Sequence, residues 1–387
     1  MRNVLVAAAS SAALLLVPSA LSAQRAGTLI SAVPAPAAPA GMQAWTIHYW
    51  SLGENGQMQD LTGMVAAPGG PTPRSARPVL AWTHGTWGVA RQCAPSLSPS
   101  FFDSNAGTAP TTFTATPALD AVASGYVVVA PDYPGLGSGG VHPYLGGVPA
   151  ARSTLDAIRA AQAIPGAMAG TRFALWGASQ GGHAALWTAQ LAASYAPELT
   201  LVGVAAAAPP TDLIANLRGG SDPSIRAFLT AFTAYSWSGY YGAPLASLGK
   251  PQTQMIITRL AQNNCVSIDS KPKLGAMIGM VMLRNQLTGV DLGTIQPWAG
   301  IARGNSVTPA AITVPMLVAQ NPNDVIVSPA VTRTYARQAC AAGKRVTWID
   351  IVGKGHPTSA QDSAAPTLQW IADRFAGKPA PSDCGSI

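Results

Sequence analysis

A serine flanked by two glycines stands between an apolar run and a helical pattern. Residues 177–181 read Gly-Ala-Ser-Gln-Gly, follow the apolar run at 172–177 and precede the helical pattern at 183–196. In a strand–turn–helix context, this spacing presents the Ser179 Oγ at a sharp turn above the sheet edge, with the helix N-terminus aimed at developing negative charge. The alternative interpretation is a Gly-rich turn with an incidental serine. The strand before and the helix after favour a nucleophile at Ser179.

A serine nucleophile requires a general base, and the base requires a group that orients it. His356 follows the last apolar run inside a Gly-flanked loop, and Asp324 directly follows the run before it. Ser179, Asp324 and His356 therefore leave strand ends in the order typical of α/β hydrolases. A helix-capping Asp324 and a surface His356 are the alternatives. Asp350 alternates inside an apolar run and Asp362 lies past the loop, so both are weaker candidates for the carboxylate.

Acyl transfer through a serine also requires hydrogen-bond donors for an oxyanion, and backbone N–H groups commonly supply them. One donor is predicted at Gln180, the residue after the nucleophile. The second is predicted at Thr86, on the loop after an early apolar run, where Gly85 leaves room for a substrate carbonyl. The neighbouring His84 is interpreted as a support for this loop rather than as a catalytic group.

These residues require a scaffold, and the hydrophobic pattern predicts a parallel sheet. Two strands are expected to flank the turn-rich residues 53–57. Six further apolar runs alternate with helical patterns, which is typical of parallel strands covered on both faces. These six runs are residues 78–84, 126–132, 172–177, 201–210, 314–320 and 346–353. The predicted class is α/β, with an α/β-hydrolase fold, a mostly parallel sheet and helices on both faces.

Five regions are predicted along the chain. A helical cap is expected where about ninety residues lack a strong β run, because one α/β crossover is far shorter. The regions are a signal peptide (1–23), a Pro/Ala-rich linker (24–43), the first part of the hydrolase core (44–210), the helical cap (211–306) and the second part of the core (307–387).

The N-terminal region predicts export. Arg2 precedes an apolar stretch at residues 4–17, and small residues follow up to a cleavage site near Ala23. The linker is expected to be extended and mobile, with order beginning near Trp45. No later stretch reaches 18 apolar residues, so a soluble secreted or periplasmic protein is expected.

The charge pattern argues against a nucleic-acid partner. The formal net charge is +7, yet no run of Lys and Arg exceeds two residues, whereas nucleic-acid binders concentrate positive charge on one stripe or helix. No phosphate-cradling loop or dinucleotide fingerprint occurs, so no cofactor is predicted. In the loop at 131–145, Asp132, Tyr133 and His142 are expected to hydrogen-bond within a pocket wall. A metal site at Asp132 and His142 is the minor alternative, and His183 is interpreted as a packing residue.

The four cysteines predict disulfides. Cys93, Cys265, Cys340 and Cys384 are far apart and lack the close paired spacing of zinc ligands. In an exported protein, two structural disulfides are the favoured interpretation. Three pairings remain open from the spacing alone.

Five motifs together resemble the secretory lipase family, which comprises exported lipase A-type α/β hydrolases. They are THGTWGVARQCAPS (83–96), APDYPGLGSGGVHPYL (130–145), GASQGGHAALW (177–187), NPNDVIV (321–327) and GKGHP (353–357). The resemblance covers about residues 45–375. It implies a Ser179–Asp324–His356 triad, a helical cap over an acyl pocket, and hydrolysis of carboxylic esters without a cofactor.

The resemblance has two further implications. Family members join the cysteine of the Cys-Ala-Pro-Ser motif to one in the cap, which implies Cys93 with Cys265 and leaves Cys340 with Cys384. Some members place an acidic residue near the oxyanion position, where this sequence has Thr86 and Trp87. The sequence departs from the family pattern there.

The predicted cap is rich in aromatic and Met side chains. Most are expected to form the core of the cap, but its underside must face the active site as an adaptable apolar wall. They are Phe228, Phe232, Tyr235, Trp237, Tyr240, Tyr241, Met277, Met280 and Met282.

The predicted substrate is an uncharged, hydrophobic ester with a short to medium acyl chain, or a glyceride. The motif loops hold no Arg or Lys cluster for a phosphate or carboxylate. A serine peptidase or an acyltransferase on the same fold, and a catalytically silent binding protein, are the alternatives. Contact with a lipid interface is compatible with this substrate, and no stable protein partner is indicated.

Overall fold

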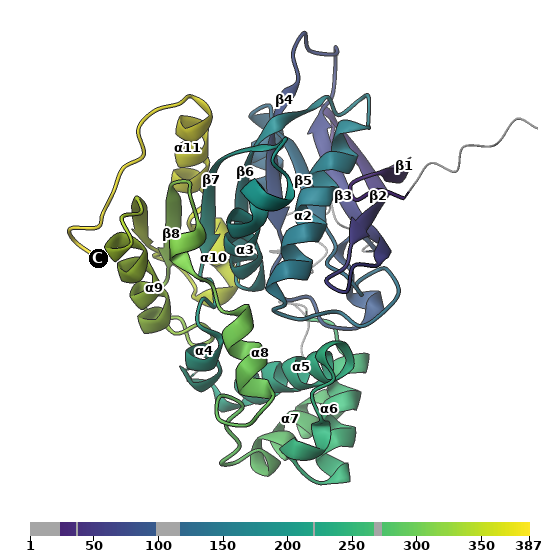
Figure 1. The fold of residues 1–387 in the computed structure, drawn as a ribbon, viewed down its shortest axis with the longest axis vertical. Coiled ribbons are helices and arrows are strands. Elements are labelled where there is room, and N and C mark those ends of the chain that lie inside the picture. Colours follow the sequence, from purple (N-terminus) through teal and green to yellow (C-terminus); the bar gives the residue numbers. More distant parts are fainter. Residues whose placement is uncertain (1–23, 36–37, 98–116, 220, 267–272) are drawn as a thin grey trace, which may run out of the picture.

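The computed structural model describes residues 24–35, 38–97, 117–219, 221–266 and 273–387, and these form a nine-stranded sheet (Figure 1). The order is β1-β2-β3-β5-β4-β6-β7-β8-β9, antiparallel from β1 to β5 and parallel from β5 to β9. The strands are β1 (Leu29–Pro34), β2 (Met42–Leu52), β3 (Met58–Pro68), β4 (Arg77–Thr83), β5 (Val127–Pro131), β6 (Ala169–Ala178), β7 (Thr200–Ala207), β8 (Met316–Gln320) and β9 (Val346–Asp350).

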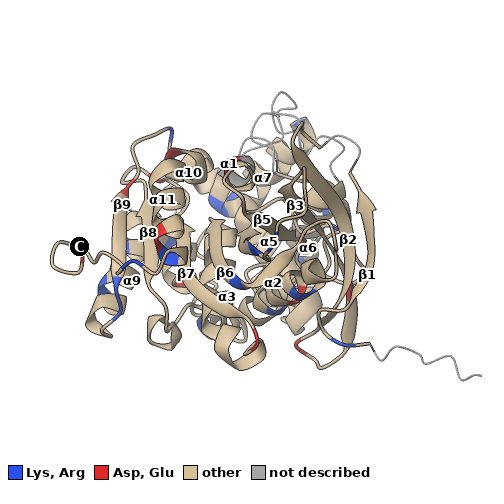
Figure 2. Ribbon diagram, turned by 90° about the horizontal axis from the view of Figure 1, so that it is seen from above, with Lys and Arg blue, Asp and Glu red and all other residues tan. Residues whose placement is uncertain are grey.

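Helices cover both faces of the sheet (Figure 2). Side chains alternate along each strand, so Val79 belongs to the buried cluster that contains Leu155 on one face, while Leu80 belongs to the cluster that contains Trp370 on the other. The first face carries α2 (Gly147–Gln162), α3 (Gln180–Tyr195) and α9 (Pro329–Ala341), and the second carries α1 (Pro117–Ala123) and α11 (Ala364–Phe375). The mostly parallel, doubly covered sheet confirms the predicted fold class.

The helical cap lies between β7 and β8, beyond the carboxyl ends of the parallel strands (Figure 1). Its helices are α4 (Leu213–Gly219), α5 (Pro223–Tyr241), α6 (Pro251–Asn263), α7 (Leu274–Gln286) and α8 (Trp298–Asn305). Asp222 caps α5 by accepting hydrogen bonds from the N–H groups of Ser224 and Ile225. The cap buries its own apolar cluster around Phe232 and Trp237. Within the described ranges, no helix is both long and apolar enough to cross a membrane.

The predicted linker at residues 24–43 is wrong. Part of it forms β1, which pairs with β2 in antiparallel register, and β2 itself begins at Met42 rather than near Trp45. The apolar side chains of Leu29 and Val33 suit a strand, and Pro34 is tolerated because β1 is an edge strand that ends there. The predicted signal peptide, residues 1–23, lies outside the described residues.

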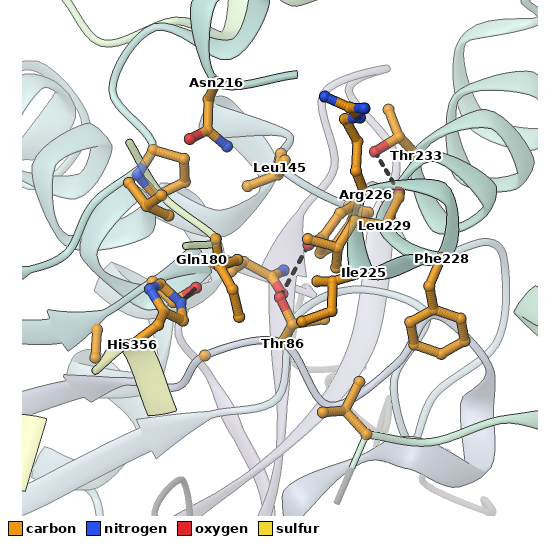
Figure 3. A pocket seen from close by; sticks show the side chains of 18 of the residues that line it. Thr86, Leu145, Gln180, Asn216, Ile225, Arg226, Phe228, Leu229, Thr233 and His356 are labelled. Atoms are coloured by element: carbon orange, nitrogen blue, oxygen red, sulfur yellow. Dashed lines mark hydrogen bonds between the residues drawn. The ribbon is translucent and has the colours of Figure 1, made fainter. Parts of the chain in front are cut away.

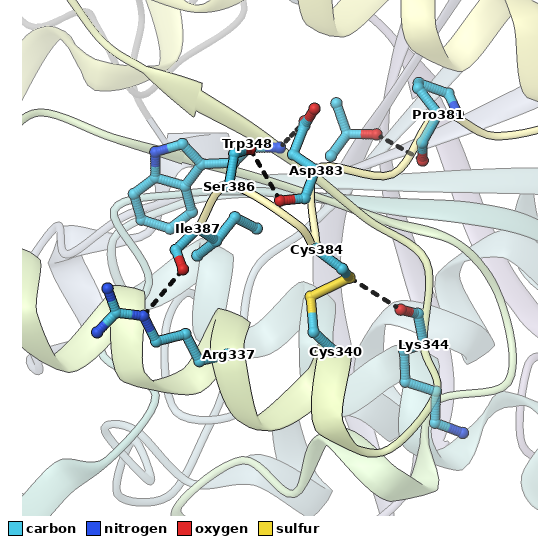
Figure 4. The surroundings of a disulfide bond; sticks show 10 residues. Arg337, Cys340, Lys344, Trp348, Pro381, Asp383, Cys384, Ser386 and Ile387 are labelled. Carbon is cyan, nitrogen blue, oxygen red and sulfur yellow. Dashed lines mark hydrogen bonds between the residues drawn. A yellow bond between two sulfur atoms is a disulfide. The ribbon is translucent and has the colours of Figure 1, made fainter.

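The C-terminal tail covers the free edge of β9 (Figure 4). The Asp383 N–H donates to the Val346 carbonyl, with an N···O distance of 2.8 Å that is ordinary for such a bond. The Trp348 N–H donates to the Asp383 carboxylate, also at 2.8 Å. An exposed strand edge is open to pairing with other chains, so this tail protects β9 from such pairing.

Two disulfides join the pairs that the family resemblance implies. Cys93 bonds to Cys265, 172 residues later, and Cys340 bonds to Cys384, 44 residues later. The first disulfide connects the loop after β4 to the helical cap, and the Val266 N–H reinforces it by donating to the Trp87 carbonyl at 2.7 Å. The second anchors the C-terminal tail to α9.

We expect removal of Cys93–Cys265 to destabilise the protein more than removal of Cys340–Cys384, because it closes the longer loop of the unfolded chain. The chain-entropy relation predicts that the free energy of unfolding falls by about 5 kcal/mol for the longer loop and about 4 kcal/mol for the shorter one, a difference of about 1 kcal/mol between the two Cys→Ser double variants. Urea denaturation measures both. An equal or reversed order would contradict the prediction, and peptide mapping without reductant would establish the pairs independently.

Candidate active site

Ser179 lies on a strained turn between β6 and α3. Its backbone has φ of 56° and ψ of −125°, in a region that residues with side chains rarely adopt. The N–H of Ser179 donates to the Ala207 carbonyl of β7 at 2.9 Å, and its own carbonyl accepts from the His183 N–H at 3.1 Å. The turn therefore starts α3 immediately after the serine and directs the serine side chain toward the cap side of the sheet.

The two flanking glycines are required by close packing against the end of β4. A Cβ on Gly181 would overlap the Thr83 carbonyl oxygen, and a Cβ on Gly177 would overlap the Thr83 hydroxyl. The same hydroxyl donates to the Gly181 carbonyl at 2.7 Å. The Gly-x-Ser-x-Gly spacing therefore reflects a direct contact between the end of β4 and the turn from β6 into α3.

Ser179, His356 and Asp324 form one hydrogen-bonded chain. His356 Nε2 lies 2.8 Å from the Ser179 Oγ, and His356 Nδ1 lies 2.7 Å from an Asp324 carboxylate oxygen. The carboxylate can only accept, so Nδ1 donates to Asp324 and Nε2 is left to accept from the serine hydroxyl. The structure brings these three predicted residues together from the ends of β6, β8 and β9.

Asp324 is held as a carboxylate although it is buried. Its second oxygen accepts from the N–H groups of Ile326 and Val327 at 2.8 and 2.9 Å. Burial alone would raise the pKa of Asp324, but hydrogen bonding to His356, the charge of His356 and the two N–H groups outweigh it and lower that pKa. The carboxylate therefore stays charged to a lower pH than that of an ordinary aspartate.

Thr86 and Gln180, the predicted oxyanion-hole residues, both line the pocket above Ser179 (Figure 3). Gln180 is the first residue of α3, and the N–H of such a residue has no acceptor four positions back within its helix. The Thr86 Oγ1 lies 2.9 Å from the Tyr144 hydroxyl. Donation of the two backbone N–H groups to an oxyanion stays a prediction.

The pocket is an apolar cavity of about 290 Å³ between the cap and the sheet edge (Figure 3). Ser179 and His356 both line it. The apolar lining includes Leu145, Leu213, Leu217, Ile225, Phe228, Leu229, Trp237 and Val266.

The predicted Met and aromatic wall is correct only in part. Phe228 and Trp237 line the pocket, whereas Leu and Ile side chains supply most of the remaining wall. Met277 and Met282 lie on the outer face of α7 instead, 47% and 36% exposed. The reason is that α7 is apolar on all sides, so its composition does not show which face is buried.

Other predicted polar residues support the loops around the site. His84 Nδ1 lies 2.7 Å from the Gly85 carbonyl, and burial lowers its pKa to about 4. Burial also lowers the pKa of His183 to about 4, and its Nε2 donates to the Asn305 carbonyl of α8 at 2.7 Å. Asp132 accepts from the hydroxyls of Thr62 and Ser96, outside its own loop.

The minor metal interpretation gains no support. The described part of the chain has no group of three or more His, Cys, Asp and Glu residues placed to hold a metal ion. His142 instead donates from Nδ1 to the Pro134 carbonyl at 2.9 Å.

Two residues near the site were not predicted. Gln320 donates to the Asp324 carboxylate at 3.1 Å from the last position of β8, and Tyr144 meets Thr86. Gln320 carries a signal that could have found it, since a polar residue ends an otherwise apolar run. Tyr144 carries none, because its partner lies 58 residues away on another loop.

The strand order, the covered sheet and the turn at Ser179 define an α/β hydrolase. The secretory lipase family model matches residues 101–232 and 296–383, which is more than half of the chain. The protein belongs to the secretory lipase family.

Curated relatives are a little over a quarter identical to this chain across the residues that align. A Mycobacterium tuberculosis protein named a probable inactive lipase is 28% identical over 265 residues, 67% of this chain. Lipase A of Moesziomyces aphidis is 27% identical over 284 residues, 69% of this chain. These matches span only 57% and 58% of the relatives' own lengths. A secreted triacylglycerol lipase of Malassezia globosa is 28% identical over 333 residues, covering 76% of this chain and 65% of its own.

Solved structures share the fold. Lipase A of Candida antarctica in its closed state has a TM-score of 0.75 at 21% identity, covering 95% of this chain and 86% of that one. A rice cell wall degrading esterase of Xanthomonas oryzae has a TM-score of 0.64 at 20% identity, covering 91% and 97%. At this level of identity the likeness establishes the architecture alone.

We expect Gly181→Ala to abolish labelling of Ser179 by a fluorophosphonate, because the new Cβ would force the turn away from Thr83. Gly275→Ala is the matched control, since a Cβ there meets no atom within 4 Å. In-gel fluorescence after labelling measures the effect, and thermal melting shows whether the variant folds. Wild-type labelling of Gly181→Ala would contradict the packing argument.

Proposed function

We propose that this protein is a secreted serine hydrolase that cleaves carboxylic esters. The observation that carries the proposal is the hydrogen-bonded chain from Asp324 through His356 to Ser179, at the floor of an apolar pocket. Family membership and the lipases and esterases among the relatives and structural neighbours support ester hydrolysis.

In the first half of the proposed reaction, the Ser179 Oγ attacks the ester carbonyl carbon while His356 Nε2 accepts the hydroxyl proton. Asp324, bonded to Nδ1, stabilises the imidazolium that forms. The carbonyl oxygen becomes an oxyanion that accepts from the N–H groups of Gln180 and Thr86. His356 then gives its proton to the departing alcohol oxygen, the C–O bond breaks, and an acyl group remains on Ser179.

In the second half, water replaces the alcohol. His356 Nε2 removes a proton from the water as its oxygen attacks the acyl carbon, and the same N–H groups hold the second oxyanion. Collapse of this intermediate releases the carboxylic acid and returns the proton to the Ser179 Oγ. Apart from the substrate and this water, the groups named in the two half-reactions all belong to this chain.

The lining of the pocket supports an uncharged, hydrophobic acyl group. Aliphatic side chains of α4 and α5, such as Leu217 and Leu229, form much of the wall. A cavity of about 290 Å³ is near the lower end of typical small-ligand sites. Short to medium acyl chains, including those of glycerides, are therefore the proposed substrates.

The predicted signal peptide, the two disulfides and the secretory family support a place of action outside the cytoplasm. The surface of the cap supports contact with a lipid interface. Leu274 and Ile278 on α7 are 71% and 53% exposed. Residues 223–290 contain one acidic residue, Asp269, against six basic residues: Arg226, Lys250, Arg259, Lys271, Lys273 and Arg284.

A catalytically silent binding protein is the competing function, and one relative is named a probable inactive lipase. A silent relative usually lacks one member of the hydrogen-bonded chain. Here all three groups are present at bonding distance, which favours an enzyme.

We expect Ser179→Ala to lower kcat for ester hydrolysis on the order of 10⁴- to 10⁶-fold, because it deletes the attacking oxygen. His356→Ala should give a similar loss. The matched control is Ser194→Ala, an exposed serine on the same helix, which should keep wild-type kcat. Release of p-nitrophenol from p-nitrophenyl esters measures all three. Substantial ester hydrolysis by Ser179→Ala would contradict the proposed mechanism.

We expect kcat/KM to be highest for esters of short to medium acyl length and to fall once the chain exceeds the pocket. A p-nitrophenyl ester series of increasing acyl length, run beside a tributyrin emulsion and an aminopeptidase substrate, measures this. Cleavage of the peptide substrate without ester turnover would replace the proposed function with a peptidase. No turnover and no fluorophosphonate labelling would identify a silent protein.

A further inference from the structure

One short segment, residues 142–144, contacts both predicted oxyanion-hole residues. The His142 ring lies against the side chain of Gln180, and the Tyr144 hydroxyl lies against that of Thr86. This segment follows β5 and belongs to neither of the two loops that carry the hole. The proposed reaction assigns no role to these two contacts.

His142 fixes the side chain of Gln180. Because His142 Nδ1 donates to the Pro134 carbonyl at 2.9 Å, its neutral ring leaves Nε2 as an acceptor, and the Gln180 Nε2 lies 3.0 Å from it and donates. Burial lowers the pKa of His142 to about 3, so the ring stays an acceptor across the working pH range. Among the described residues, the buried Gln180 Oε1 has no hydrogen-bond partner. His142 is therefore the hydrogen-bonding anchor of this side chain.

Tyr144 fixes the second loop. Its hydroxyl lies 2.9 Å from the Thr86 Oγ1, and burial raises the pKa of Tyr144 to about 12, which keeps the hydroxyl neutral. The two loops are also connected through Tyr133, which is stacked on the His142 ring and donates its hydroxyl to the His84 carbonyl at 2.9 Å.

Helix α5 of the cap holds the segment from the opposite side. The Ser236 Oγ accepts from the Tyr144 N–H at 2.7 Å and donates to the His142 carbonyl at 2.5 Å. The Trp237 Nε1 donates to the Tyr144 carbonyl at 2.8 Å. Ser236 and Trp237 are fully buried, so these bonds are shielded from water.

We propose that His142 and Tyr144 are positioning residues that set the separation of the Gln180 and Thr86 N–H groups, and that α5 holds them in place through Ser236. The inference rests on the proposed function, because it concerns the donors that bind the oxyanion. Its physical basis is that an oxyanion hole stabilises charge only when its donors are already 2.7–3.1 Å from the oxyanion. The two donors lie on separate segments, the start of α3 and the loop after β4, so contacts that join these segments help to fix that spacing.

The test uses the full-length enzyme and two single variants, Tyr144→Phe, which removes only the hydroxyl, and His142→Phe, which keeps a ring. Each should lower kcat about 10- to 100-fold with KM changed less than about 2-fold, since removal of one oxyanion donor costs about 10²–10³ and a misplaced donor costs less. His142→Gln, which restores an acceptor near the position of Nε2, should recover part of the loss. Ser236→Ala removes the α5 hydroxyl that bonds the 142–144 segment, so it should also lower kcat, by a smaller factor.

An alkyl boronic acid distinguishes positioning from general damage. The Ser179 Oγ bonds to its boron, the hydroxyl proton passes to His356, and the tetrahedral adduct places an oxygen where the oxyanion forms. Its inhibition constant should rise by the same factor as kcat falls, while the melting temperature of Tyr144→Phe stays close to that of wild type. Tyr335→Phe is the matched control, because this buried hydroxyl lies by the Met316 sulfur in the core and should leave both values unchanged.

A double-variant cycle tests whether His142 acts through Gln180. His142→Phe combined with Gln180→Met should lose no more activity than the more damaged single variant, since both remove one bond. Additive losses, or single variants with wild-type kcat and boronate affinity, would overturn the inference while leaving the esterase intact. If His142→Phe fails to fold, the kcat and boronate affinity of Tyr144→Phe and Gln180→Met still test the inference. A wild-type protein without ester turnover or Ser179 labelling would instead overturn the proposed function and this inference together.

Discussion

The close approach of β4 to the turn after β6 determines the geometry around Ser179. A backbone conformation with φ of 56° costs a residue other than glycine roughly 1–3 kcal/mol of free energy. Such a conformation persists only where the surrounding structure fixes it. Here the Thr83 hydroxyl bonds the Gly181 carbonyl, the Ala207 carbonyl accepts from Ser179, and neither flanking glycine has room for a Cβ. The direction of the serine side chain and the start of α3 both follow from these contacts. The strain is therefore maintained by the packing of neighbouring strands.

The distance between His356 and Ser179 depends on parts of the fold far from the pocket. His356 follows β9, the last strand of the sheet, whose outer edge has no neighbouring strand. Asp383 pairs with that edge, and the Cys340–Cys384 disulfide anchors the tail that carries it (Figure 4). On the other side of the site, Cys93–Cys265 ties the loop of Thr86 to the cap. Two covalent links therefore flank Ser179 and His356, one at the β9 edge of the sheet and one between the loop after β4 and the cap.

The sequence was informative wherever burial imposes a pattern. Parallel strands covered on both faces must be apolar, so their runs were visible, and Asp324 and His356 could be placed at strand ends. β1 was missed because its Pro/Ala-rich neighbourhood resembles a linker, and only pairing with β2 makes it a strand. The bonds of Ser236 to the 142–144 segment join positions more than ninety residues apart. The hydrophobic pattern of the sequence cannot predict such contacts, because they depend on how the cap packs against the rest of the protein.

The departure at Thr86 has a physical consequence for the proposed oxyanion hole. A charged carboxylate about 4 Å from an oxyanion would oppose it by about 4 kcal/mol at an effective dielectric constant near 20. Thr86 and Tyr144 form a neutral pair instead, and burial keeps the nearby rings of His84 and His142 uncharged by lowering their pKa values to about 4 and about 3. Asp324 carries its negative charge on the far side of His356, where it favours the imidazolium. The two charges of the proposed transition state therefore meet different surroundings: a fixed carboxylate faces the cation, and neutral dipoles face the oxyanion.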